Sequence, residues 1–121
     1  MENFNDIQDK RRFKRISVNM PLQYKNLRRL GELPAGSLTK NISEGGVCFK
    51  SREFISLACR LVVEINIPTT TKPVKAISKV AWIRKLPVSD EYELGNQFLD
   101  MTKEDKVHVQ NFVNGVLSAN P

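Results

Sequence analysis

The sequence contains few of the residues on which enzymes and metal centres depend. It has one histidine and two cysteines, and Cys48 and Cys59 are too few and too far apart for a metal site or a disulfide framework. No carboxylates form a recognisable acid–base pair, and Gly45-Gly46 is not followed by the lysine of a phosphate-binding P-loop. We therefore expect no catalytic residue, no metal and no cofactor. Both cysteines are interpreted as reduced, small hydrophobic residues within strands.

Long apolar runs are also missing. The longest, such as Leu61-Val62-Val63, are far too short to cross a bilayer. The first fifteen residues contain no apolar stretch like that of a secretory signal peptide. These absences predict a cytoplasmic protein without a membrane span.

Positive charge, by contrast, is plentiful and unevenly distributed. Residues 1–30 contain eight Lys and Arg against three Asp and Glu, whereas residues 31–121 contain eleven against ten. A basic N-terminal region joined to a nearly neutral body points to an anionic partner. Phosphate-bearing molecules are the first candidates, whether a nucleic acid, a nucleotide or a lipid head group.

Most of the chain has the pattern of β-strands. From Ser17 to Tyr24, apolar and polar residues alternate, which is the period of a strand with one buried face. Similar segments predict further strands at 35–42, 47–49, 60–67, 74–84 and 92–99. Strands that follow one another without intervening helices favour a barrel or a sandwich over an α/β sheet.

The last segment has the period of a helix. Its apolar residues fall at i, i+3, i+4 and i+7, namely Val109, Phe112, Val113 and Val116. Thr102, followed by Asp105, resembles a capping box. We predict a mostly β fold: a six-stranded antiparallel β-barrel with a C-terminal α-helix that docks on an open end or side. The expected boundaries are a flexible leader at 1–9, a basic arm at 10–16, the barrel at 17–100 and the helix at 102–118, with one domain spanning 10–118.

Two short motifs carry the functional information. The basic arm contains Arg11-x-x-x-Arg15, and further along the chain comes Asn41-x-Ser43-x-x-Gly46 between two predicted strands. Alone, the first could be a solvated tail or a nucleic-acid arm, and the second an ordinary turn. In this order, with the later segments Val80-Ala81-Trp82 and Gly95-Asn96-Gln97-Phe98 and a terminal helix, they resemble the PilZ domain family. The resemblance covers the chain from about Arg11 to Leu117 and implies a receptor for cyclic di-GMP that is not an enzyme.

The resemblance assigns ligand binding to Arg11, Arg15, Asn41, Ser43 and Gly46. A guanidinium fork matches phosphate oxygens and the N7 and O6 acceptors of guanine, and its flat face stacks on a purine. An amide offers a donor and an acceptor, and a hydroxyl can donate. Gly46 is expected to let the backbone turn and the ligand approach without a Cβ in the way.

Further residues are candidates for accessory contacts: Lys10, Arg12, Gly45 and Trp82. For Trp82, packing at the barrel rim is the alternative to facing a purine. In this family the residue before the first motif arginine influences whether one ligand or a stacked pair binds, and Lys10 leaves both open. His108 is interpreted as a surface or boundary residue of the helix.

The resemblance also implies a mode of action. We expect the arm to be mobile alone and to order over cyclic di-GMP, which changes the surface met by a partner protein acting in trans. That partner would be a motor, synthase or secretion component. One alternative is a PilZ-type adaptor that no longer binds nucleotide, but every motif residue is present. The other is a small basic barrel that binds nucleic acid. The low aromatic content and the concentration of charge in the arm argue against it.

Overall fold

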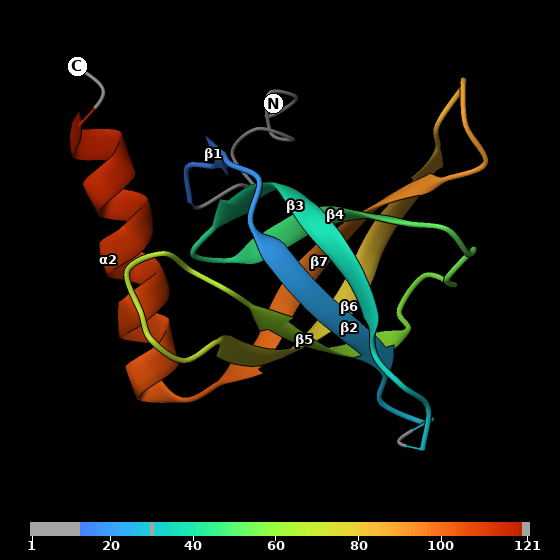
Figure 1. Cartoon of the computed structure of the whole chain (residues 1–121), viewed down its shortest axis with the longest axis horizontal. Helices are drawn as coiled ribbons and strands as arrows, with labels where there is room; N and C mark the ends of the chain where they lie inside the picture. Colours follow the sequence, from blue (N-terminus) through green and yellow to red (C-terminus); the bar gives the residue numbers. More distant parts are fainter. Residues whose placement is uncertain (1–12, 30, 120–121) are drawn as a thin grey trace, which may run out of the picture.

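The computed structural model describes residues 13–29 and 31–119, which form seven strands and one helix (Figure 1). In chain order these are β1 (Ile16–Ser17), β2 (Pro21–Asn26), β3 (Ala35–Ser43), β4 (Gly46–Ser51), β5 (Arg60–Ile65), β6 (Val74–Lys85), β7 (Tyr92–Met101) and α2 (Lys103–Ala119).

Six of the strands close into an antiparallel barrel. Neighbouring strands pair in the order β3-β2-β5-β6-β7-β4, and the pairing of β4 with β3 completes the ring. The short β1 is an additional strand that pairs with β3 through Ile16↔Ile42 and Ser17↔Asn41. The predicted fold class, a six-stranded antiparallel barrel followed by a helix, is confirmed.

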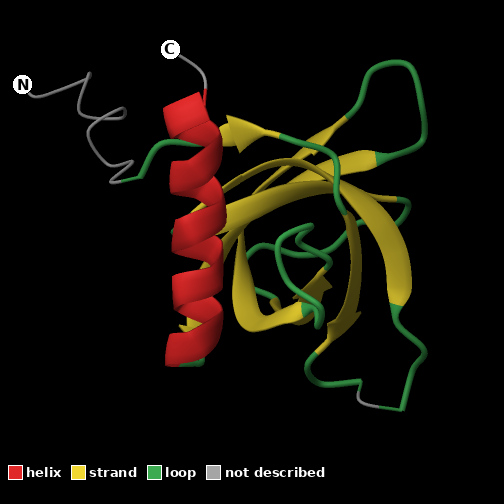
Figure 2. Ribbon diagram, turned by 60° about the vertical axis from the view of Figure 1, so that its left-hand side comes forward, coloured by secondary structure: helices red, strands yellow, loops and turns green. Residues whose placement is uncertain are grey.

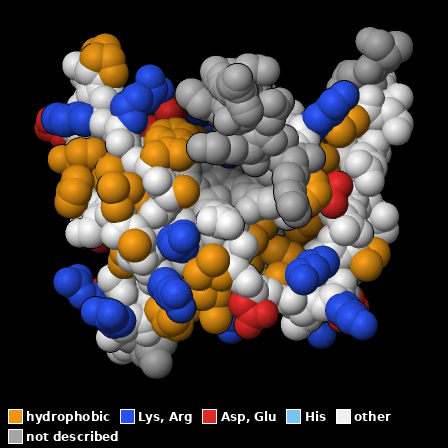
Figure 3. All heavy atoms as spheres, turned by 180° about the vertical axis from the view of Figure 1, so that it is seen from behind, with side chains coloured by type: hydrophobic (Ala, Val, Ile, Leu, Met, Phe, Trp, Pro, Cys, Tyr) orange, Lys and Arg blue, Asp and Glu red, His pale blue; other side chains and the backbone are white. Residues whose placement is uncertain are grey.

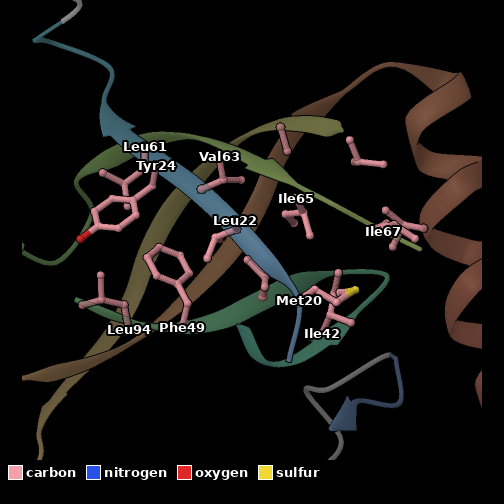
Figure 4. Packing of buried hydrophobic residues seen from close by; sticks show 14 of the residues in the cluster. Met20, Leu22, Tyr24, Ile42, Phe49, Leu61, Val63, Ile65, Ile67 and Leu94 are labelled. Atoms are coloured by element: carbon pink, nitrogen blue, oxygen red, sulfur yellow. The ribbon is translucent and has the colours of Figure 1, made fainter. Parts of the chain in front are cut away.

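The inside of the barrel is filled by the alternate residues of each strand. Leu22 and Tyr24 of β2 point towards Phe49 of β4 and Leu94 of β7 (Figure 4). The rings of Tyr24 and Phe49 lie 4.9 Å apart between centroids. Full burial of one such side chain stabilises the fold by about 1.5–3 kcal/mol. Because inward residues are large and apolar, a ligand has no room inside the barrel, and a binding site must lie on its outer surface.

The first predicted strand is interrupted, which corrects the expectation of one continuous strand from Ser17 to Tyr24. Between β1 and β2, the chain is held instead by Thr39 of β3. Its hydroxyl accepts a hydrogen bond from the Met20 amide, and its own amide donates to the Met20 carbonyl, both at 2.9 Å. These bonds satisfy backbone groups where the regular ladder stops. They also anchor the chain directly after the basic arm.

Helix α2 stands across one end of the barrel (Figures 1 and 2). Its predicted apolar stripe is buried at Val109, Phe112 and Val113, which join the barrel core. Thr102 Oγ1 accepts a hydrogen bond from the Asp105 amide at 3.1 Å, as expected for a cap. The capping box is not completed, because the Asp105 carboxylate accepts from the Lys75 amide at 3.1 Å and so ties the helix to β6. Within the described residues, no helix has the length and apolar character needed to cross a bilayer.

The two cysteines are free thiols in different settings. Cys48 lies in β4, as predicted. Cys59 lies just before β5 and not in a strand. Its sulfur accepts a hydrogen bond from the side-chain Nδ2 of Asn26 at 3.3 Å. The interpretation of Cys59 as a strand residue was therefore wrong.

Candidate ligand-binding site

A groove runs over the outer surface of the barrel where β3, β4, β7 and β6 lie side by side. Its volume is about 570 Å³, within the range of about 300–1,000 Å³ typical of small-molecule sites. Residues from the arm, the β3–β4 hairpin and both later strands line it: Phe13, Arg15, Ser43, Gly45, Gly46, Ala81, Trp82, Gly95, Asn96 and Gln97. The groove thus brings together segments that are far apart in the sequence.

The two sequence motifs meet at the edge of this groove. Arg15 Nη1 donates a hydrogen bond to Asn41 Oδ1 at 2.8 Å, and the Arg15 side chain is half-buried. Asn41 lies beneath the arm at β1, since it is the strand partner of Ser17. Lys10, Arg11 and Arg12 lie outside the described residues. The structure therefore joins only the second half of the arginine motif to the asparagine motif.

Most of the asparagine motif lies within strands and not in a connection between them, and the predicted strand at 35–42 already included Asn41. Asn41 and Ser43 belong to β3, Gly46 begins β4, and only Glu44 and Gly45 form the turn of the hairpin. Ser43 is buried, and its hydroxyl accepts a hydrogen bond from the Gly45 amide at 3.1 Å. The regular pairing of Ser43 with Gly46 closes the hairpin, so the motif residues have fixed positions on a rigid strand pair.

One of the two expectations for Gly46, that it lets the backbone turn, was wrong. None of the glycines in the described part of the chain has a positive φ, so Gly46 does not serve to turn the backbone. A Cβ at this position would collide with the carbonyl oxygen of Asn96 on the neighbouring strand β7. The glycine is required because two strands approach closely here. Gly46 also lines the groove.

Gly95 was not recognised as a site residue from the sequence. Its strand partner on β6 is Trp82, and the indole ring occupies the space that a Cβ of Gly95 would need. Trp82 is 37% exposed, so part of the ring faces solvent at the groove. A glycine inside a strand pattern indicates close approach of another group, and that signal could have identified Gly95. Trp82 thus packs on Gly95, and its exposed part is also open to a ligand.

Phe13 lies in the segment that the sequence predicts as the basic arm, between Arg11 and Arg15. Its ring packs against Gly45, where Cδ2 would lie 2.9 Å from an added Cβ, and it is 40% exposed. Phe13 also borders a second hollow between the hairpin turn and α2. Gly45 thus serves as a contact surface for the arm.

A buried carboxylate lies beside the groove and was also missed. Glu93 of β7 is 3% exposed, and its two oxygens accept hydrogen bonds from Lys40 Nζ at 2.8 Å and Arg84 Nη2 at 2.7 Å. Burial alone would raise the pKa of Glu93, but the hydrogen bonds and charges of Lys40 and Arg84 outweigh it and hold that pKa below its usual range. Glu93 therefore stays ionised at neutral pH.

Positive groups lie in and beside the groove. Arg15 lines it, and Lys40 and Arg84 meet at Glu93 nearby. Lys and Arg side chains are also spread over the face opposite to that of Figure 1 (Figure 3). Several of these charged groups also affect the pKa of Cys48, which is buried in β4. Burial raises the pKa of its thiol to about 11, helped by the charge of Glu93 and opposed by Lys40, Arg15 and Arg84. The groove is thus suited to an anion, and its one buried thiol is unreactive near neutral pH.

Groups associated with catalysis are not gathered here. Among residues 13–29 and 31–119, no cluster of three or more His, Cys, Asp or Glu side chains could hold a metal ion. His108 is on α2, at 3.8 Å from Glu104 one turn earlier, and is partly exposed. The arrangement can bind and orient an anionic molecule through guanidinium, amide, hydroxyl and indole groups.

Comparisons with known proteins agree with this geometry. The model of the PilZ domain family matches residues 9–115. A search of curated proteins finds no match. The PilZ domain of YcgR with c-di-GMP, from Escherichia coli, has a TM-score of 0.69 at 16% identity, with 91% of this chain and 93% of that chain covered.

Two longer proteins contain the same fold. The inhibitor of motility MotI/DgrA of Bacillus subtilis has a TM-score of 0.72 at 18% identity, and the match covers 90% of this chain. The complex of K. pneumonia MrkH with c-di-GMP has a TM-score of 0.69 at 13% identity, and the match covers 89% of this chain. In each case the chain spans about half of the other protein, 52% of its length.

Proposed function

The chain belongs to the PilZ domain family, and on that premise we propose that it is a receptor for cyclic di-GMP. The observation that carries the proposal is the contact between Arg15 and Asn41, which unites the two family motifs at the edge of a ligand-sized groove. Similar domains with cyclic di-GMP bound have been solved for YcgR and MrkH. The proposal extends that ligand to this chain.

The side chains of the groove suit both parts of the ligand. Cyclic di-GMP has two phosphates and two guanines, and the fork of Arg15 matches either a phosphate or the Hoogsteen edge of guanine. Asn41 supplies amide groups for a base edge. The Ser43 hydroxyl accepts one hydrogen bond from Gly45 and can still donate one to the ligand. The exposed part of Trp82 offers a flat apolar surface for a purine.

The arm completes the site in this proposal. Arg11 and Arg15 together clamp the ligand from outside, with Lys10 and Arg12 as accessory phosphate contacts. Phe13 lies between them and already packs on Gly45, so the arm has an attachment point beside the groove. Residues 10–16 then order over the ligand, and the free-energy cost of ordering is offset by charge-assisted hydrogen bonds.

We further propose that the chain acts by binding and not by catalysis. It passes the signal in the cytoplasm to a separate protein, such as a motor, synthase or secretion component, that recognises the ordered arm and the adjoining surface. MotI/DgrA is an inhibitor of motility and MrkH a transcription regulatory factor, so similar domains take part in different outputs.

Isothermal titration calorimetry of the full chain with cyclic di-GMP tests the proposal. We expect saturable binding with one or two nucleotides per chain, and no comparable binding of GTP or cyclic AMP at the same concentrations. Equal affinity for GTP would contradict the assignment. Absence of binding, with a folded chain, would favour a nucleotide-independent adaptor, and salt-sensitive binding of unrelated DNA or RNA would favour a nucleic-acid protein.

A further inference from the structure

Glu93 forms a bridge that spans three strands on the outer face of the barrel. It lies on β7, two residues from Gly95, and the two residues share the outward face. Lys40 lies on β3, and β4 runs between β3 and β7. The 2.8 Å contact between Lys40 and Glu93 therefore crosses over β4. Cys48, which β4 presents to the same face, is only 1% exposed, as expected for a residue beneath such a bridge.

Lys40 occupies an irregular position in β3. The register of β3 against β4 shifts between Thr39 and Asn41, so that Lys40 is the extra residue of a β-bulge. The extra residue of a bulge changes the direction of a neighbouring side chain. Here that neighbour is Asn41, which accepts the hydrogen bond from Arg15. An exposed lysine alone would not fix a bulge, since exposed ion pairs contribute little. Here, however, the acceptor is a buried carboxylate.

Arg84 fixes the orientation of that carboxylate. It lies opposite Glu93 on β6 and donates to Oε1, whereas Lys40 donates to Oε2. With both oxygens engaged from opposite sides, the carboxylate cannot rotate without losing a charge-assisted hydrogen bond. Glu93 is thus a fixed anchor for Lys40 and does not simply neutralise it.

We infer that Glu93 is a positioning residue for the nucleotide, acting through Lys40 and the bulge to hold Asn41 and Arg15 in the geometry that the ligand requires. The inference rests on the proposed function. A buried carboxylate beside a site for a dianion would repel the ligand, so electrostatics alone gives no reason for Glu93 to be there. A positioning role supplies that reason. The Glu93 carboxylate accepts hydrogen bonds from Lys40 and Arg84, and through Lys40 it acts on the bulge.

The sign of one substitution separates positioning from electrostatics. Glu93→Gln removes a negative charge beside a site for a dianion, so the field alone would make binding tighter. Loss of the anchor would make binding weaker, by about tenfold for residues that share a hydrogen-bond network. Glu64→Gln removes the same charge from β5, away from the groove, and should leave the affinity unchanged.

The measurement is the affinity for cyclic di-GMP of the wild-type chain and both variants by titration calorimetry, with circular dichroism to verify folding. If the wild type binds and Glu93→Gln binds as tightly or more tightly, the positioning role is wrong while the receptor assignment stands. If the wild type does not bind, the receptor assignment itself fails.

A double-mutant cycle distinguishes positioning from general loosening of the fold. In an Asn41→Ala background, Glu93→Gln should have little further effect on affinity, because the residue that it positions is gone. In a Ser43→Ala background, its effect should be retained in full, because Ser43 is held by the hairpin. If Glu93→Gln weakens binding by the same factor in both backgrounds, Glu93 acts only on stability, and the inference is overturned.

A second pair of variants keeps the test decisive if Glu93→Gln does not fold. Lys40→Met and Lys50→Met each remove one exposed cation from the same face, and Lys50 is the strand partner of Glu93. Only Lys40 forms the bridge over β4. We expect Lys40→Met to weaken binding several-fold more than Lys50→Met at 0.15 M salt. Equal losses would show a field effect without positioning.

Discussion

Arg15 and Asn41 are separated by 26 residues, yet a 2.8 Å hydrogen bond joins their side chains at the edge of the groove. The bond is between a guanidinium donor and a neutral amide acceptor, so it is weaker than the contact that the same guanidinium makes with a phosphate. A phosphate-bearing ligand can therefore compete for Arg15, and Asn41 holds the arginine near the position where the ligand needs it.

The first prediction concerns the arginines. Arg11→Ala and Arg15→Ala should each remove a charge-assisted interaction with cyclic di-GMP worth about 1.5–3 kcal/mol, which corresponds to roughly tenfold to somewhat over a hundredfold in affinity. Lys14→Ala, at an exposed position of the same arm, is the matched control and should have a much smaller effect. Calorimetric titration gives the affinities. Normal binding by both arginine variants would show that the clamp does not exist.

The second prediction concerns two glycines of the same sheet. Gly46→Ala introduces a Cβ that collides with the Asn96 carbonyl, and such overpacking should lower the free energy of unfolding by about 1–3 kcal/mol. Gly36→Ala is the same chemical change on β3 where no atom lies within 4 Å, so it should be nearly neutral. Urea unfolding of the two variants provides the comparison. Similar free energies of unfolding would show that β4 and β7 do not approach closely at Gly46.

The contrast between these glycines illustrates what sequence can and cannot predict. Strand positions followed from the two-residue period, and the helix from its apolar stripe, because burial acts on neighbours in the chain. The role of Gly46 depends on which backbone passes beside it, and that is decided by the pairing of β4 with a strand some fifty residues later. The period of a strand contains no information about that register.

The same limit explains the missed carboxylate. Glu93 and Lys40 are 53 residues apart, and their contact requires a bulge in β3 and two correct strand registers. From the sequence alone, Glu93 is a glutamate in an alternating strand, and such a residue is expected to face solvent. The arginine and asparagine motifs were identified because they resemble a family pattern, and the hydrogen bond between Arg15 and Asn41 joins the two motifs.

The third prediction concerns Trp82, the single tryptophan of the chain. If a guanine stacks on its exposed part, Trp82→Leu should cost about 1–3 kcal/mol of binding free energy, whereas Trp82→Phe, which keeps a ring, should cost less. The wild-type fluorescence should change on titration with cyclic di-GMP and saturate at the calorimetric stoichiometry. An unchanged affinity in Trp82→Leu would restrict this residue to packing on Gly95.

The fourth prediction concerns pH. The lowered pKa of Glu93 means that its ionised form is stabilised by folding. Its contribution to stability is therefore present above its ordinary pKa of 4.5 and is lost as the pH falls through the lower pKa of the folded state. The difference in unfolding free energy between wild type and Glu93→Gln should be largest near neutral pH and should shrink in acid. Denaturant titrations at several pH values measure it, and a difference independent of pH would show that Glu93 is not ionised as described.

The last prediction concerns the order of the arm. The barrel is closed by hydrogen bonds on every strand, and Thr39 anchors the chain at Met20, so ligand binding should leave the amides of the barrel almost unchanged. In the arm, Phe13 packs on Gly45 and Arg15 donates a hydrogen bond to Asn41 without any ligand. The many charges and few apolar side chains of the arm nevertheless offset little of the roughly 1–2 kcal/mol per residue that ordering costs, so we expect the ligand to supply most of its order. Cyclic di-GMP should therefore protect the amides of residues 10–16 from hydrogen exchange in wild type, and much less so in Arg15→Ala at saturating ligand. Protection confined to the barrel, with the arm exchanging equally in both states, would exclude the clamp and leave the groove between Ser43 and Trp82 as the whole site.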